Sequence, residues 1–242
     1  MANWSDPRPS ITGFGGATAA SSAAFDAGLR SYMLSVYNYM ASGVLLTGLV
    51  AMLFASSSYA VPVLTSPLRW VIMLSPLAIV FAMNMGLNRF STGALQGMYW
   101  AFAVLMGLSM SSIFLVFTGV SIAQTFFATA AAFAGLSLWG YTTKKDLSGF
   151  GTFLVMGVVG LLVAMLINIF LKSTVLQLAI SAIGVLIFAG LTAYDTQRIK
   201  SLYAHVAGSD MAGKVVIMGA LSLYLDFINM FTFLLNFMGS RD

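Results

Sequence analysis

The chain has 242 residues, of which 60% are hydrophobic and only 7% are charged, and its mean hydropathy is +0.94. Soluble proteins carry about 25% charged residues, so this composition excludes a water-soluble domain and indicates a polytopic membrane protein. The absence of cysteine excludes disulfides and thiolate metal sites, and a single histidine, His205, excludes a multi-histidine metal centre.

The N-terminal segment differs from the rest of the chain. Its first thirty residues are polar and rich in Gly, Ala and Ser, and they lack the apolar core of a cleavable signal peptide. We expect residues 1–30 to form a flexible cytoplasmic arm, in which a helix could begin at about Ser22. Residues 31–242 are expected to form one transmembrane domain.

Seven stretches are mostly apolar and close to the roughly 20 residues that a spanning helix needs. In chain order they are Ser35–Ala55, Leu68–Leu87, Leu95–Phe117, Ile122–Tyr141, Phe153–Leu171, Leu176–Tyr194 and Val215–Phe237. Because the connections between them are short, the sequence predicts an all-α fold, a compact bundle of seven transmembrane helices.

Lysine and arginine are distributed unequally over the two sides of this predicted bundle. One side carries Arg8, Arg30, Arg89, Lys144, Lys145, Arg198, Lys200 and Lys214. The other side carries Arg69, Lys172 and Arg241. The positive-inside rule then places the N-terminus in the cytoplasm and, with seven spans, the C-terminus outside. A re-entrant last segment would return the C-terminus to the cytoplasm.

Two aspartates stand out in these apolar stretches. Asp226 lies in the middle of the seventh stretch, and Asp195 follows the sixth at its cytoplasmic end. An ionisable group inside a membrane costs roughly 2.5–3.5 kcal/mol and by default marks a functional site. If the two carboxyls meet, they would share a proton and act as a proton switch. When deprotonated, they would offer oxygen ligands to a cation such as Ca²⁺.

Other interpretations of these aspartates stay open. Asp226 could be a buried packing group that Ser222 and Asn229 satisfy from its own helix face. Asp195, beside Arg198 and Lys200, could form an ion pair at the membrane interface.

Basic residues nearby also have two interpretations. Arg89, at the end of the second stretch, could reach the aspartates as a latch, or it could simply anchor the helix at the interface. The pair Lys144 and Lys145 is typical of a topological anchor.

Three motifs resemble the Bax inhibitor-1 family, also called the transmembrane Bax inhibitor motif family. The strongest is ALSLYLDFINMF at Ala220–Phe231, which is similar to the C-terminal signature of that family. The others are YDTQ at Tyr194–Gln197, followed by a basic cluster, and KKDLS at Lys144–Ser148. Their order and spacing also match, and the resemblance covers residues 30–239.

The resemblance implies a seven-helix bundle with the last helix at its centre. It also implies a pH-sensitive Ca²⁺ leak whose pore is controlled by a hydrogen-bonded aspartate pair, Asp195 and Asp226 by motif position, with Tyr194 beside it. Family members are linked to Ca²⁺ homeostasis and, in eukaryotes, to suppression of cell death. Bacterial relatives are associated with regulation of membrane proteases, and this chain resembles a bacterial inner-membrane member.

One feature departs from the family pattern. Channel-like members carry a glutamate in the second span, whereas here that span reads LSPLAIV at Leu74–Val80 and has no acid. This departure removes one cation ligand from a predicted pore. It therefore favours an alternative, a non-conducting regulator that binds a membrane protease or another membrane protein.

An intramembrane aspartyl protease is a third interpretation, because two aspartates on adjacent helices can activate water. Such enzymes show Gly-x-Gly-Asp, but Asp226 follows Leu-Tyr-Leu and no Pro-Ala-Leu motif is present. The sequence also has no hydrolytic triad, phosphate-binding loop or nucleic-acid surface. We therefore expect a protein that is not an enzyme, that needs no cofactor, and whose partners are the bilayer and permeant Ca²⁺ or protons.

Overall fold

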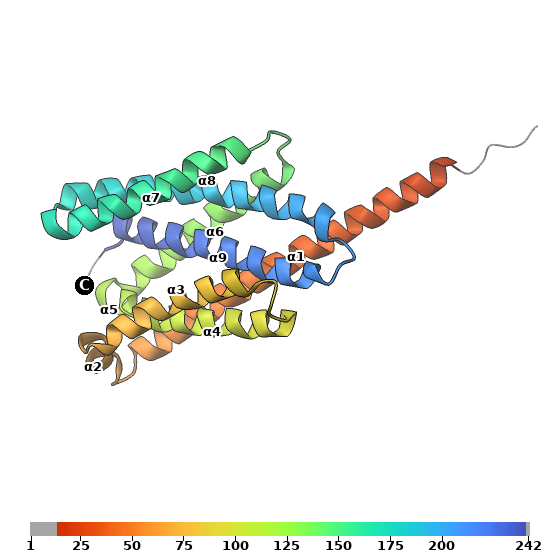
Figure 1. Cartoon of the computed structure of the whole chain (residues 1–242). Coiled ribbons are helices and arrows are strands. Elements are labelled where there is room, and N and C mark those ends of the chain that lie inside the picture. The colour runs from red at the N-terminus through yellow and green to blue at the C-terminus, as the bar shows by residue number, and fades with distance from the viewer. Residues whose placement is uncertain (1–13, 241–242) are drawn as a thin grey trace, which may run out of the picture.

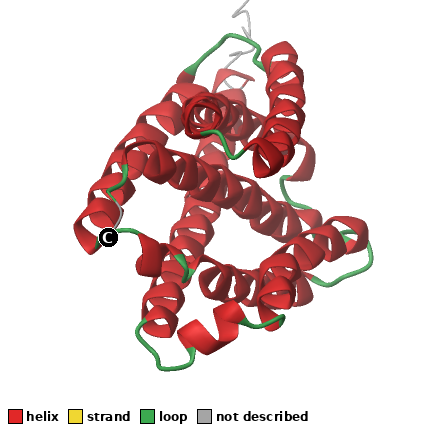
Figure 2. Cartoon of the chain, turned by 90° about the vertical axis from the view of Figure 1, so that its left-hand side faces the viewer, coloured by secondary structure: helices red, strands yellow, loops and turns green. Residues whose placement is uncertain are grey.

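A computed structural model describes residues 14–240 of the chain, with side chains from Ala23 onward. Within this range the chain folds into helices joined by turns, without a β-strand (Figure 2). Seven helical spans are long and apolar enough to cross a membrane. The predicted all-α membrane bundle is thereby confirmed.

The helices follow one another with short connections (Figure 1). The long ones are α1 (Phe14–Ala55), α3 (Leu68–Gly86), α4 (Thr92–Met110), α6 (Gly119–Thr142), α7 (Ser148–Leu171), α8 (Thr174–Val206) and α9 (Met211–Met238). Two short helices, α2 (Ala60–Thr65) and α5 (Ile113–Val116), lie in the connections.

Three predicted boundaries differ from the structure. Helix α1 begins at Phe14, before the start at about Ser22 that the sequence allowed, so residues 14–30 are helical and not a flexible arm; residues 1–13 lie outside the described part. The third stretch is interrupted, because α4 ends at Met110 before α5 begins. Helix α8 continues to Val206, well beyond the predicted end at Tyr194. Hydropathy detects only the apolar part of a helix, so polar turns at its ends are missed.

Local sequence explains where three of the spans begin. Ser91, Thr118 and Ser173 precede α4, α6 and α8, and each side-chain oxygen accepts a hydrogen bond from a backbone N–H in the first turn. These hydroxyls satisfy N–H groups that a helix leaves without an internal partner. Because lipid cannot supply such partners, the caps fix these ends of the spans.

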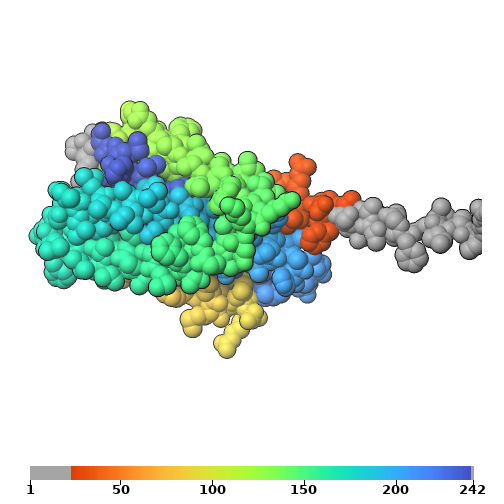
Figure 3. All heavy atoms as spheres, turned by 90° about the horizontal axis from the view of Figure 1, so that it is seen from above, coloured from red at the N-terminus to blue at the C-terminus, as the bar shows by residue number. Residues whose placement is uncertain are grey.

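Helix α9 forms the centre of the bundle and packs against α1, α4, α6 and α8. In its most apolar stretch 67% of the residues are buried, against 17% for α3 and α7. From above, α7 and α8 cover much of the molecule, and α9 is visible mainly near its C-terminal end (Figure 3). The central last helix agrees with the arrangement that the family resemblance implies.

The bundle has two distinct ends. The turns α3–α4, α6–α7 and α8–α9 lie together at what we call the basic end, because Arg89, Lys144 and Lys145 are in these turns (Figure 1). The opposite end holds α2, α5, the α7–α8 turn and Ser240.

Candidate functional site: a buried aspartate between the last two helices

Asp226 lies in the middle of α9 and is only 5% exposed. Its Oδ2 atom has no hydrogen-bond partner among the residues that the structure describes. A buried polar atom without a partner costs about 1–3 kcal/mol, so the sequence retains this carboxyl at a penalty to stability. Such a group is more readily explained by function than by packing.

Asp195 lies on α8, and its carboxyl is the neighbouring charge that acts on Asp226. Its side chain is 14% exposed, and its Oδ1 atom is 4.0 Å from a guanidinium nitrogen of Arg198. The ion pair proposed as an alternative role for Asp195 is thus present. Asp195 therefore interacts both with a basic side chain one turn away and with the carboxyl of the central helix.

The register of α8 against α9 defines how far apart the carboxyls lie along the helices. Gly184 faces Phe233 and Gly219 faces Ile199, as expected for antiparallel neighbours. In this register Asp195 lies opposite residues 222–223 of α9, about one helical turn, or roughly 5 Å of rise, from Asp226. No hydrogen bond joins the two carboxyls in the described structure, which differs from the hydrogen-bonded pair that the resemblance implies.

The polar side chains predicted to surround the pair do not bind either carboxyl. Asn229 donates to the carbonyl of Leu225 at 2.8 Å, which is the usual bond of a polar side chain to the preceding helical turn. Ser222 forms no side-chain hydrogen bond in the described part of the chain, and the Tyr194 ring lies against Gly151 of α7. The alternative in which Ser222 and Asn229 form hydrogen bonds to the Asp226 carboxyl from its own helix is therefore wrong.

Arg89 is not placed to act as a latch on the aspartates in this conformation. It is exposed at the α3–α4 turn and forms no ion pair within the described residues. That turn packs against the start of α9, where Lys214 donates to the Leu87 carbonyl at 3.2 Å. From Lys214 to Asp226 the helix rises about 18 Å, which is too far for an arginine side chain to cover.

Two of the motifs meet at the basic end through Gln197, a residue to which sequence reasoning assigned no role. Its Oε1 atom accepts from Leu147 N at 2.9 Å, and its Nε2 atom donates to the Lys145 carbonyl at 2.8 Å. One amide thus fastens the α6–α7 turn to α8. The sequence shows that both motifs, YDTQ and KKDLS, are present, but it does not show that they contact each other.

A polar cavity of about 310 Å³ opens beside this contact, and Arg198, Tyr194 and the α6–α7 turn line it. In the turn, hydrogen bonds from the Ser148 side chain and backbone N–H lower the pKa of Asp146 below its ordinary value. Asp146 therefore stays ionised near Lys144 and Lys145 at the mouth of this cavity.

Hydroxyl groups connect three helices next to Asp195. The Tyr37 hydroxyl of α1 is 2.5 Å from Ser137 Oγ of α6, which is 2.9 Å from Thr196 Oγ1 of α8. Thr196 in turn donates to the Thr192 carbonyl at 2.7 Å. Sequence reasoning missed this chain, because isolated Ser and Thr residues in apolar helices usually bond only to their own backbone.

A second polar contact joins α9 to α1 two residues before Asp226. The Tyr224 hydroxyl is 2.7 Å from Thr47 Oγ1, which donates to the Ala103 carbonyl of α4 at 2.8 Å. The central helix is therefore bound to polar groups of α1 and α4 on one side, and it carries an unpartnered carboxyl close to α8.

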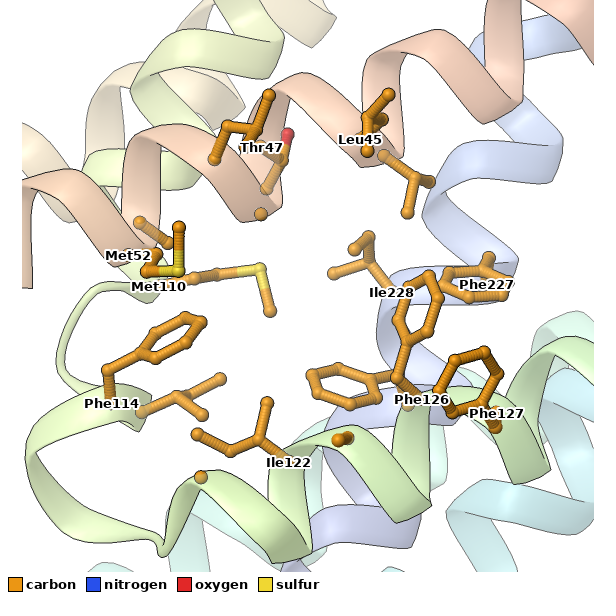
Figure 4. Close-up of a pocket in the computed structure, with 18 residues that line it drawn as sticks. Leu45, Thr47, Met52, Met110, Phe114, Ile122, Phe126, Phe127, Phe227 and Ile228 are labelled. Carbon is orange, nitrogen blue, oxygen red and sulfur yellow. The ribbon is translucent and has the colours of Figure 1, made fainter.

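An apolar cavity of about 350 Å³ lies beyond Asp226 toward the opposite end, between α1, α6 and α9 (Figure 4). Phe227 and Ile228 of α9 line it, together with Phe126 of α6 and Leu45 of α1. No charged side chain lines this cavity in the described structure. Thr47 contributes the one polar side chain of the lining, so the wall of this cavity is almost entirely hydrocarbon.

The described residues contain no group of three or more His, Cys, Asp or Glu side chains that could hold a metal ion. Calcium in proteins takes six to eight oxygen ligands. Two carboxyls one turn apart supply only part of such a shell.

Together these features define an integral membrane protein of the polytopic helical class, with an acidic pair between its last two helices. The sequence profile described as "Inhibitor of apoptosis-promoting Bax1" matches residues 29–242, and the chain belongs to this Bax inhibitor family.

Bacterial relatives match over nearly their whole lengths. The inner membrane protein YbhL of Escherichia coli is 43% identical over 89% of this chain and 94% of its own. An uncharacterized protein of Caulobacter vibrioides is 47% identical over 89% and 91%. The uncharacterized protein RP147 of Rickettsia prowazekii is 45% identical over 93% and 95%.

Proposed function

We propose that this protein is a pH-sensitive cation leak of the bacterial inner membrane, permeable to Ca²⁺, with its N-terminus in the cytoplasm. In this proposal Asp195 and Asp226 gate the path by sharing a proton. The observation that carries it is the unpartnered Oδ2 atom of Asp226, which is buried about one helical turn along the α8–α9 interface from Asp195. Two carboxyls this close cannot both be ionised at low cost, so protonation controls how α8 and α9 pack.

The conformation described here corresponds to the closed state in this proposal. An open state requires the apolar cavity beside Phe227 to widen and admit water, so that ions can pass from Asp226 to the opposite end. Separation of α1 from α6 would achieve this, because the cavity already lies between them and α9 (Figure 4). Asp195, at the basic end of the pair, would meet a cytoplasmic cation first.

The proposal is tested by measuring Ca²⁺ flux in proteoliposomes across the neutral pH range. We expect pH-dependent flux for the unmodified protein, and flux that no longer responds to pH for Asp226→Asn and Asp195→Asn. Asp210→Asn is the matched control, because Asp210 is an exposed acid in the α8–α9 turn, and it should behave as the unmodified protein. Unchanged pH dependence in both aspartate variants would exclude the gating role.

A second function, a non-conducting regulator of a membrane protease or another membrane protein, is favoured by the uncharged lining of the apolar cavity. Under this alternative the aspartate pair only sets the conformation that the partner binds. Purified protein would then show no flux at any pH, and the Asp226→Asn variant would change the amount of co-purified partner.

A further inference from the structure

A groove of about 490 Å³ lies between α1 and α6 at the basic end, separate from the aspartate pair. Its walls are mostly apolar, with Met33 and Leu34 on α1 and Phe133 and Leu138 on α6. Both helices are membrane spans at these positions, so the groove opens toward lipid.

The groove exists because α1 and α6 each pack on other helices rather than closely on each other. Helix α1 packs against α4 and α9, and α6 packs against α8 and α9. One hydrogen bond, from Tyr37 to Ser137, bridges the groove. A helix about 10 Å wide could not enter between helices held together in this way, but a single hydrocarbon chain could.

Positive charge marks the end of the groove. Arg30 lines it, is exposed, and forms no ion pair with any residue in the described part of the chain, including Asp26 one turn before it. Nearby, the Lys200 ammonium lies 4.5 Å from the centre of the Tyr141 ring, and this ring also lines the groove. Lys200 also donates to the Tyr141 carbonyl at 2.7 Å, so Arg30 is the charged side chain that lines the groove and Lys200 adds positive charge behind its wall.

An apolar slot with a cationic end complements an amphiphile that has an anionic head. The rise along α1 from Arg30 to Tyr37 is about 10 Å, which fits within the roughly 15 Å of one leaflet. We propose that the groove binds one anionic phospholipid of the surrounding bilayer, with its phosphate at Arg30 and an acyl chain between α1 and α6.

This lipid site does not depend on ion conduction. It does adjoin the aspartate region, because Ser137 contacts both Tyr37 in the groove and Thr196 next to Asp195. A bound chain that changes the spacing of α1 and α6 would act on this hydroxyl chain first.

The headgroup contact is tested with the full chain in detergent, titrated with phosphatidylglycerol or phosphatidylcholine, while native mass spectrometry counts retained lipid. Arg30→Ala should weaken phosphatidylglycerol binding about five-fold, as expected for one lost contact with an anionic lipid, and leave phosphatidylcholine binding unchanged. Arg89→Ala is the matched control, an exposed arginine at the same end outside the groove, and it should change neither.

The acyl-chain contact is tested by filling the slot. Ala134 lines the groove and is exposed, so Ala134→Phe should lower retention of both lipids. Ala132→Phe makes the same change at an exposed position of α6 outside the groove and should have no effect.

Three results would overturn the assignment. An equal loss of phosphatidylglycerol binding in Arg30→Ala and Arg89→Ala would indicate general attraction of anionic lipid to the surface. Ala134→Phe could leave lipid retention unchanged, which would place the lipid elsewhere. Loss of a bound polypeptide, and not of lipid, from Ala134→Phe would make the groove a protein-binding site.

Discussion

The two halves of the bundle are held together in different ways. At the basic end, side chains form hydrogen bonds between helices, through Gln197 to the α6–α7 turn and through Ser137 to Thr196. Toward the opposite end, hydrogen bonds join Asn168 to Gln177 and Ser240 N to Ser121, but α1 and α6 enclose an apolar cavity of about 350 Å³ that no hydrogen bond between these two helices crosses in the described structure. Hydrogen bonds allow few arrangements, whereas apolar contacts tolerate sliding. Because the Tyr37–Ser137 hydrogen bond bridges α1 and α6 at the basic end, we expect these two helices to separate first at the cavity.

A close contact between the backbones of α6 and α8 in the basic half gives the largest expected effect. A Cβ atom on Gly140 would lie 2.3 Å from the Ala193 carbonyl oxygen, and this backbone atom cannot move aside as a side chain would. Gly140→Leu should therefore destabilise the protein by about 3 kcal/mol, read as a lower melting temperature in detergent. Gly135→Leu, on the same helix with no atom within 4 Å of its Cβ position, should melt as the unmodified protein. Equal melting of both variants would show that α6 and α8 are not fixed to each other.

Removal of the Gln197 amide, which fastens the α6–α7 turn to α8, should have an intermediate effect on stability. Gln197→Ala removes both hydrogen bonds to the α6–α7 turn and should cost about 2 kcal/mol in the same measurement. Gln197→Glu keeps an acceptor for Leu147 N but loses the donor to the Lys145 carbonyl, so its loss should be about half as large. A Gln197→Ala protein as stable as the unmodified one would remove the distinction between the two halves.

A substitution in the apolar cavity should matter least. Ala123 lines the cavity, and Ala123→Leu adds hydrocarbon to an open space. Stability should change by no more than about 0.5 kcal/mol, because the new side chain neither overlaps its neighbours nor loses a polar contact. A loss as large as that of Gly140→Leu would mean that this half is as tightly constrained as the basic half.

The sequence predicted the spans well because the bilayer imposes a length and a hydropathy that can be counted along the chain. It also identified Asp226 as a costly buried acid, since no other acid lies within that apolar stretch. Both predictions depend on the composition of one segment at a time. The family resemblance added Asp195 as its neighbour.

Contacts between distant segments were predicted poorly. The sequence could not show that Asn229 binds its own helix backbone while the Asp226 carboxyl is left without a partner. The extension of α8 beyond Tyr194 also escaped notice, because its polar turns are stabilised by packing on α1 rather than by lipid. The latch role of Arg89 was predicted from its position at the end of the second apolar stretch. In the structure this residue lies at the α3–α4 turn, too far from the aspartates to contact them.

Helix α1 is longer than a membrane requires. Its 42 residues rise about 63 Å, roughly twice the thickness of the hydrocarbon core. The Phe25 ring lies tilted against the Tyr203 ring of α8, with 5.1 Å between the ring centroids, and Tyr37 further along the same helix contacts Ser137 of α6. Because no loop interrupts the helix between these two residues, a displacement of α1 at Phe25 would reach the Tyr37–Ser137 contact directly.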